Sequence, residues 1–257
     1  MASVDQYRIY AVRYGHRDSV PAWEAFHKEH AAPPDGMDYF VWAITNGQRT
    51  VIVDTGYSEE EGVRRGRQFL RSPAVGLAEL GIDANHVEHV VLSHFHYDHI
   101  GGTALFPRAT FWVQEAEMRF YTGPNATRPA FRGSIYLPDI LSVVTLNYAG
   151  RVAFADGDVE IVPGIWVHAA SGHTAGMQIV SSETSRGRAV LTSDASHYYA
   201  NMDEGNAFNT FVDLAGVYRA YDRIRALAAS ADLIVPGHDP LVLQRLNRVG
   251  DGIVELL

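Results

Sequence analysis

The chain has 257 residues, a formal net charge of −9 and no cysteine. The acidic balance excludes a general nucleic-acid-binding surface, and the lack of cysteine excludes disulfides and thiolate metal ligands. No apolar run is long enough to cross a bilayer, and the segment 1–6 lacks the basic-then-apolar layout of a signal peptide. We therefore expect one domain, 1–257, located in the cytoplasm.

β-Branched and aromatic residues gathered between turn signals predict the strands. They lie at Tyr7–Tyr14, Asp38–Thr45, Thr50–Val53, Val87–Leu92, Thr110–Val113, Val152–Phe154, Val159–Val167, Met177–Ser181, Ala189–Thr192 and, last, Asp232–Val235. Helices are predicted by charge pattern or by apolar residues every three to four positions. They lie at Glu59–Arg71, Ala74–Leu80, Gln114–Tyr121 and Phe211–Ala228, with a short helix closing the chain.

These elements predict an α/β fold in which two packed sheets are covered outside by helices, an αββα four-layer sandwich. The strand Val152–Phe154 is expected to pair with Val159–Val167. Pro33-Pro34-Asp35-Gly36 predicts a loop between the first two strands.

The most informative stretch is Ser93-His94-Phe95-His96-Tyr97-Asp98-His99, which follows the apolar Val90-Val91-Leu92. It places three imidazoles and one carboxylate within six residues. Such side chains bind zinc and similar divalent metals, and crowding them in one loop without a cation would be costly. The loop therefore predicts a metal site with enough donors for more than one ion.

Three later segments each place one further ligand-type residue beside small residues, after an apolar run. They are Ser171-Gly172-His173, Ser193-Asp194-Ala195 and Pro236-Gly237-His238. Layered α/β folds build their sites where strands end in loops, and small residues let the backbone come close. Taken singly, the histidines could be turn residues and Asp194 a helix cap. Together with the His-rich loop they indicate one convergent site.

This residue set resembles the metallo-β-lactamase superfamily, in the branch with two metals per site. The resemblance spans about residues 38 to 240 and includes Asp54, which in this family braces the metal loop. It implies that both ions share Asp194 and a hydroxide as bridges. It further implies one metal on His94, His96 and His173, and the other on Asp98, His99 and His238. Zinc is expected for both, although iron, manganese and cobalt also suit such ligands.

Within the superfamily, Asp194-Ala195-Ser196 and the compact length are most similar to the N-acyl homoserine lactonase group. This resemblance implies a hydrolase that opens a lactone by attack of the metal-bridging hydroxide, with Asp98 shuttling the proton. A pyridoxolactone-type ring, another lactone or a cyclic amide remains open, as does a glyoxalase II-like thioester. An RNA-cleaving enzyme is disfavoured by the acidic chain, and a non-enzymatic metal-dependent binding protein is the alternative of another class. The expected partner is a small molecule, with neither nucleic acid nor membrane, and a homodimer is left open.

Two regions are expected to select the substrate. The stretch 122–148 is a long connection of the kind that forms lids, or else a packed surface excursion. The stretch 196–211 follows Asp194 and is rich in aromatic residues. In the lactonase group a tyrosine three positions after the bridging Asp bonds the carbonyl or leaving-group oxygen. Here that position is His197, followed by Tyr198, so either ring replaces the tyrosine as donor, both merely pack, or the substrate differs.

Overall fold

The protein is described from a computed structural model that covers residues 6–30, 32 and 34–256. Its strands are β1 (Arg8–Arg17), β2 (Met37–Thr45), β3 (Thr50–Val53), β4 (Gln68–Phe69), β5 (His89–Val91), β6 (Thr110–Gln114), β7 (Val152–Ala155), β8 (Val159–Val162), β9 (Ile165–Ala169), β10 (Gln178–Thr184), β11 (Gly187–Leu191), β12 (Ile234–Val235), β13 (Asn247–Gly250) and β14 (Ile253–Leu256). Its α-helices are α1 (Ala22–Ala25), α2 (Glu59–Arg64), α3 (Pro73–Glu79), α4 (Tyr97–Ile100), α5 (Glu115–Thr122), α6 (Pro129–Arg132), α7 (Leu137–Tyr148), α8 (Tyr199–Asp203), α9 (Leu214–Leu227) and α10 (Leu241–Arg245).

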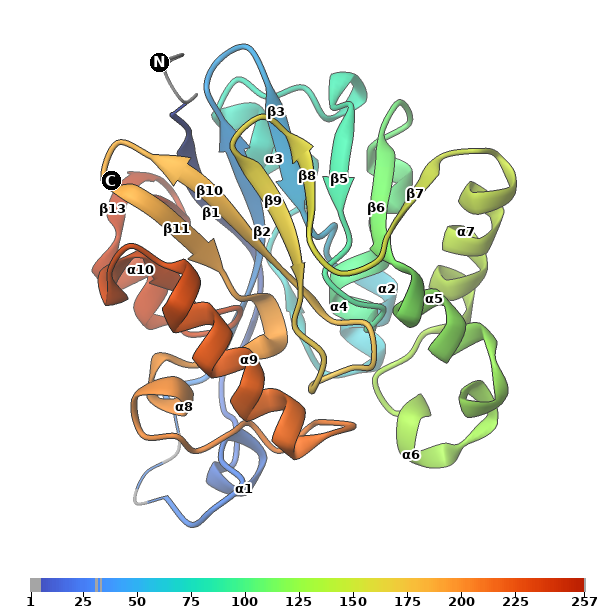
Figure 1. Ribbon diagram of the computed structural model, residues 1–257, viewed down its shortest axis with the longest axis vertical. Coiled ribbons are helices and arrows are strands. Elements are labelled where there is room, and N and C mark those ends of the chain that lie inside the picture. Colours follow the sequence, from blue (N-terminus) through green and yellow to red (C-terminus); the bar gives the residue numbers. More distant parts are fainter. Residues whose placement is uncertain (1–5, 31, 33, 257) are drawn as a thin grey trace.

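The strands form two sheets that pack face to face, with helices on their outer faces (Figure 1). The larger sheet has nine strands in the order β13-β14-β1-β2-β3-β5-β6-β7, with β4 paired to β1. The smaller sheet has five, in the order β12-β11-β10-β9-β8. Both sheets mix parallel and antiparallel pairs. The expected α/β sandwich of two mixed sheets flanked by helices is therefore confirmed.

The strand β2 shows why the sheets must be covered on both sides. Its successive side chains alternate between two apolar cores, because a strand presents alternate residues to opposite faces. Val41 and Ala43 belong to the core under the outer helices, whereas Trp42 and Ile44 belong to the core between the sheets. All four are fully buried. A strand that is apolar on both faces is stable only as a central layer.

The helix α9 covers the outer face of the smaller sheet (Figure 1). Val217, Tyr221 and Ile224 are spaced to lie on one face of the helix, and they join Ile179 and Val190 of the sheet in one buried cluster. The predicted amphipathic helix is thus confirmed, although it begins at Leu214 and not at Phe211. Across the described residues, no helix is both long and apolar enough to cross a membrane.

The prediction of one helix over Glu59–Arg71 was wrong. The helix α2 ends at Arg64, and the chain then turns at Gly66, which has a φ of +65°. This left-handed conformation stops a helix and suits glycine. The following residues pair as β4 with β1. The charged residues after Arg64 that suggested a longer helix lie in the turn between α2 and β4.

Two predictions about strand order were also wrong. Val152–Phe154 does not pair with Val159–Val167, because β7 joins β6 in the larger sheet while β8 and β9 form a hairpin in the smaller one. Asp232–Val235 is not the last strand, because β13 and β14 follow and extend the larger sheet beside β1. The short helix α10 precedes this hairpin instead of closing the chain.

The stretch 122–148, expected to be a long connection, contains regular helices. It contains a 3₁₀ turn (Pro124–Thr127), the short helix α6 and the twelve-residue helix α7. Ile140 and Val143 of α7 enter the core beneath the larger sheet, which anchors the stretch. Of the predicted loop before β2, residues 34–36 carry no helix or strand, whereas Pro33 lies outside the described residues.

Candidate metal centre

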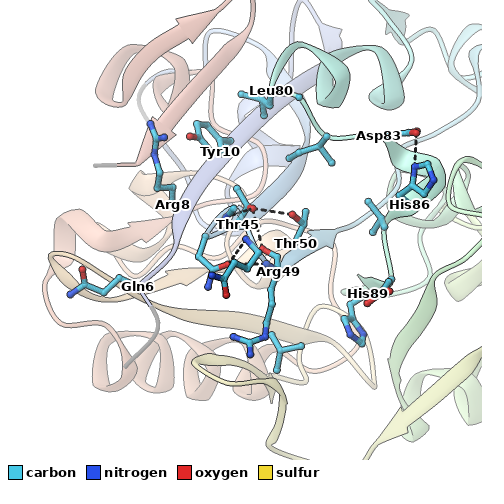
Figure 2. Close-up of a pocket in the computed structure, with 18 residues that line it drawn as sticks. Gln6, Arg8, Tyr10, Thr45, Arg49, Thr50, Leu80, Asp83, His86 and His89 are labelled. Carbon is cyan, nitrogen blue, oxygen red and sulfur yellow. Dashed lines mark hydrogen bonds and ion pairs between the residues drawn. The ribbon is translucent and has the colours of Figure 1, made fainter. Parts of the chain in front are cut away.

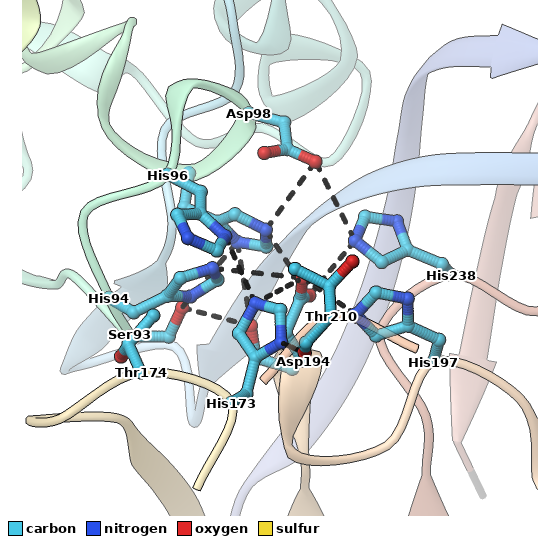
Figure 3. Close-up of polar contacts among 12 residues, drawn as sticks. Ser93, His94, His96, Asp98, His173, Thr174, Asp194, His197, Thr210 and His238 are labelled. Carbon is cyan, nitrogen blue, oxygen red and sulfur yellow. Dashed lines mark hydrogen bonds and ion pairs between the residues drawn. The ribbon is translucent and has the colours of Figure 1, made fainter. Parts of the chain in front are cut away.

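The seven predicted ligands lie together in neighbouring donor groups. Figure 3 shows the histidine and aspartate side chains that it labels turned toward one another. His94 and His96 follow β5, and the short helix α4 carries Asp98 and His99. The other three lie at strand ends in the smaller sheet: His173 between β9 and β10, Asp194 after β11 and His238 after β12. Loops from both sheets therefore contribute, as expected for a site built at strand ends.

Asp194 lies at the centre and divides its two oxygens between two groups of histidines. Its Oδ2 lies 3.6 Å from His94 Nε2 and 3.3 Å from His173 Nε2. Its Oδ1 lies 3.2 Å from His99 Nε2 and 2.9 Å from His238 Nε2. One carboxylate thus faces two separate sets of donors. This is the geometry needed to bridge two cations.

Each set gains one further donor from the loop after β5. His96 turns its Nδ1 toward His173 Nε2, at 3.0 Å. Asp98 Oδ2 lies 3.6 Å from His99 Nε2 and 3.7 Å from His238 Nε2. Within each set the donor atoms lie within 4.8 Å of one another. The two sets are those that the sequence resemblance implied.

Three of the inward-facing ligand atoms lack hydrogen-bond partners, which is the feature that fits a metal. Among the described residues, His94 Nε2, His99 Nε2 and Asp194 Oδ1 are buried without any hydrogen bond. Buried polar atoms are normally paired, so such a cluster of unpaired donors needs an explanation. A cation held between them would satisfy all of them at once.

The outward-facing ring nitrogens, in contrast, are held by the protein. His173 Nδ1–H donates to the Thr210 carbonyl at 2.7 Å, and His238 Nδ1–H donates to the Asp38 carbonyl at 2.8 Å. His99 Nδ1–H donates to the Asp54 carboxylate at 2.8 Å. A proton fixed on the outer nitrogen leaves the lone pair of the inner nitrogen directed at the centre.

Asp54 connects the two sheets beneath the site, as the resemblance implied. Its carboxylate accepts the Ser93 N–H at 2.8 Å, the Ser93 hydroxyl at 2.9 Å and the Ser193 hydroxyl at 3.1 Å, besides His99. Asp54 and Ser193 have φ values of +64° and +43°, which are unusual for residues other than glycine. Strain of this kind persists where surrounding bonds compensate for it, and it gathers at functional sites.

Burial sets the protonation of the first set. It lowers the pKa of His94 and His96 well below the usual value, and it lowers the pKa of His173 to about 4. In the second set, burial also opposes the charged form, but the surrounding carboxylates, Asp194 foremost, together outweigh it and raise the pKa of His99 and His238. The first set is therefore neutral at physiological pH, the form in which imidazole binds metals.

The structure separates the two candidate donors after Asp194. His197 points into the centre, with Nε2 2.9 Å from Asp194 Oδ2, and its ring packs on Phe208 with centroids 3.5 Å apart. Tyr198 points away, and its hydroxyl donates to the Gly36 carbonyl at 3.2 Å. His197 also lies close enough to Asp194 and His238 to form a third group of metal-binding donors.

A small pocket of about 70 Å³ opens onto the first set of ligands. Beside His96 and His173, it is lined by Tyr121, Phe131 and Phe211. Phe131 comes from the stretch 122–148 and Phe211 from the stretch 196–211, the two regions expected to contact substrate. A larger cleft, about 790 Å³, lies at the 46–49 turn between β2 and β3 (Figure 2), and none of the metal-binding groups of the described chain lines it.

Two supporting residues on α5 escaped the sequence analysis. The buried Glu117 carboxylate accepts the Phe95 N–H at 2.8 Å, the Thr174 hydroxyl at 2.9 Å and the Gly176 N–H at 2.7 Å. It thereby ties the loop after β5 to the loop that carries His173. Tyr121, one turn along α5, bonds the outer nitrogen of His96. The predicted helix placed both residues on one face, but nothing local in the sequence indicates which distant loop that face touches.

Comparison with known proteins agrees with this geometry. The family model of the Metallo-beta-lactamase superfamily matches residues 34–238. An N-acyl homoserine lactonase from a Bacillus species is 28% identical over 197 residues, which cover 70% of this chain and 73% of the relative. The N-acyl homoserine lactonase AiiA of Bacillus thuringiensis subsp. kurstaki is 28% identical over 167 residues, 63% of this chain and 60% of that protein.

Solved structures share the fold over the whole chain. A quorum-quenching N-acyl homoserine lactone lactonase superposes with a TM-score of 0.79 at 20% identity, covering 99% of this chain and 100% of the other. AidC, a dizinc quorum-quenching lactonase in complex with a product, has a TM-score of 0.70 at 14% identity, with 99% and 95% covered. The chain belongs to the metallo-beta-lactamase superfamily. The expected family and fold are confirmed, and its homologues are hydrolases, as the sequence predicted.

Proposed function

We propose that the chain 1–257 acts as a single-domain, dinuclear metal-dependent hydrolase that opens a lactone ring. The observation that carries the proposal is the central Asp194, which presents one oxygen to each of two donor sets. Each set contains a buried inner nitrogen, on His94 and on His99, that has no hydrogen-bond partner. The lactone substrate is supported by the relatives that are named N-acyl homoserine lactonases.

The residues assigned to the metals follow from this arrangement. Two divalent ions, when bound, supply an activated water near neutral pH and polarise the substrate carbonyl. His94, His96 and His173 hold one ion, Asp98, His99 and His238 hold the other, and Asp194 is shared. Zinc would be held by such imidazole and carboxylate ligands, and iron, manganese and cobalt also accept mixed nitrogen and oxygen ligands.

The protein supplies the proton transfers through two side chains. Asp98 reaches both His99 and His238, so its carboxylate is placed to take up the proton released at the nucleophile and return it to the ring oxygen that leaves. His197 projects into the same space, and we assign it the hydrogen bond to the carbonyl or leaving-group oxygen. Its ring is fixed by Phe208, which keeps Nε2 directed at the centre. Tyr198 is engaged with Gly36 and is assigned no part in this step.

The proposal is tested by metal analysis combined with a panel of lactones, before and after chelation. We expect two ions per chain, turnover that chelation abolishes, and recovery on adding zinc. His197→Gln should lower kcat by about 100-fold at unchanged metal content, as expected when a positioned proton donor is lost. Two bound ions without turnover of any lactone would refute the lactonase assignment, and hydrolysis of an S-acyl thioester instead would favour the glyoxalase II-like alternative.

A further inference from the structure

The His96 ring is oriented differently from the other histidines of the site. His94, His99, His173 and His238 face the centre through Nε2, whereas His96 faces it through Nδ1. Its Nε2 lies on the outer side, 3.2 Å from the hydroxyl oxygen of Tyr121. An imidazole that offers the lone pair of one nitrogen to a metal carries its proton on the other. His96 therefore donates, and the Tyr121 oxygen accepts.

With His96 as the donor in this bond, the hydroxyl hydrogen of Tyr121 is left without an acceptor among the described residues. In the part of the chain that the structure describes, the bond with His96 is the one hydrogen bond that this hydroxyl makes. Tyr121 lines the pocket beside the first metal set, and a phenol carries its proton at neutral pH. A buried donor that lacks an acceptor costs free energy, and a substrate group can supply that acceptor.

The other walls of the pocket limit what that substrate group can be. Phe131 and Phe211 are apolar, and the volume of about 70 Å³ is small. An engineered protein cavity that binds benzene measures roughly 150 Å³, so this pocket suits a group of about half that size. A short acyl chain joined to the ring through an amide satisfies both the donor and the apolar walls.

We propose that Tyr121 is a specificity-determining residue whose hydroxyl donates a hydrogen bond to a carbonyl on the substituent of the lactone ring. The site then prefers lactones with a short acylamino substituent over those with no substituent or with a plain alkyl group. This inference rests on the proposed lactonase function. It assigns to Tyr121 two bonds with opposite roles, accepting from His96 and donating to the substrate.

The test compares Tyr121→Phe with the unaltered enzyme on N-butanoyl homoserine lactone and on unsubstituted γ-butyrolactone. Loss of one neutral hydrogen bond should lower kcat/KM for the acylated lactone by about 5- to 10-fold, mainly through KM. For γ-butyrolactone the loss should be about 5-fold smaller than for the acylated lactone, because that substrate has no group for Tyr121 to bond. Tyr218→Phe, on α9 and away from the pocket, is the matched control.

Two further measurements separate this role from a structural one. Calorimetric binding of the product N-butanoyl-L-homoserine should weaken by a similar factor in Tyr121→Phe, at unchanged metal content. In the unaltered enzyme, a γ-butyrolactone with an alkyl group of equal length in place of the acylamino group should be the poorer substrate. That comparison needs no variant.

Four results would overturn the inference. An equal loss on both lactones, or a loss of metal, would mean that Tyr121 only orients His96. Equal use of the acylamino and alkyl lactones by the unaltered enzyme would mean that the donor is not used. No turnover of any lactone by the unaltered, metal-loaded enzyme would overturn the proposed function itself, and this inference with it.

Discussion

The substitution Asp54→Asn tests how the protein orients one half of the metal centre. Asp54 is 1% exposed, and its two oxygens accept bonds from donors in three different residues. Asparagine has nearly the same shape and tolerates the left-handed φ of +64°, so the backbone is not perturbed. However, one of its two terminal atoms is a donor. Whichever way the amide turns, that donor faces either the Ser93 N–H or the His99 Nδ1–H, and neither of these can turn away.

The magnitude follows from what His99 must then do. If the amide nitrogen faces His99, the ring either loses its bond or moves its proton to Nε2, where it would block the inner lone pair. Loss of such a supporting bond typically lowers metal affinity by about 10- to 100-fold, or about 1.4 to 2.8 kcal/mol. The ion on Asp98, His99 and His238 should weaken by this factor. The ion on the other set should keep its affinity, because none of its ligands bonds to Asp54.

The assay is a competition titration of zinc against a chromophoric chelator, which resolves two affinities per chain. Asp222→Asn, at a side chain that is 84% exposed, is the matched control. The reasoning would be refuted if Asp54→Asn bound both zinc ions with the affinities of the unaltered protein. An equal loss of zinc affinity at both sites would also refute it. The first result would mean that Asp54 does not orient His99, and the second that it only stabilises the fold.

Three further predictions test other parts of the structure. His96→Ala should leave about one ion per chain and Asp194→Ala less than one, measured by mass spectrometry of the purified proteins; unchanged content in both would contradict the assigned ligands. Phe211→Ala should raise kcat/KM for acyl chains two methylenes longer by about 10-fold, since each buried methylene contributes about 0.8 kcal/mol, and an unaltered chain-length profile would place the acyl group elsewhere. Burial lowers the pKa of His168 below its ordinary 6.5, although Asp158 opposes this effect. The unfolded chain therefore takes up the proton first, and stability falls as pH drops through about 6.5. His168→Gln should flatten that part of the stability–pH curve in denaturant titrations, and an identical slope in both proteins would show that His168 does not contribute.

The part of the site that the sequence predicted is the part with a local signal. The spacing His94, His96, Asp98, His99 lies within one loop, and the distant ligands could be found because each ends an apolar strand. The aromatic and β-branched residues of Asp38–Thr45 likewise predicted the strand β2. Such patterns can be recognised from neighbouring residues alone, and the number and order of the predicted strands and helices indicate the fold class.

The errors arose where non-local contacts decide the structure. The pairing of β7 with β6, and of β14 with β1, joins segments that are far apart in sequence. No periodicity encodes such partners. The support from Glu117 and Tyr121 was missed for the same reason, since a helix pattern shows which residues share a face but not what that face touches. The direction of His197 and Tyr198 could not be separated either, because neighbouring residues in a loop can point either way.

The metal ligands and the substrate pocket depend on different elements. The ligands are positioned by strand ends and by buried hydrogen bonds that cross between the sheets, as at Asp54 and Glu117. The apolar pocket walls Phe131 and Phe211 lie outside every strand, in segments that follow α5 and precede α9. Substitutions in these segments leave the hydrogen bonds between the strands intact, and segments that connect the strands tolerate change. Tyr121 is the exception, because it touches His96 and also lines the pocket. Changes of substrate should therefore be reached through Phe131 and Phe211 without contact to a metal ligand, whereas Tyr121 also accepts a hydrogen bond from His96.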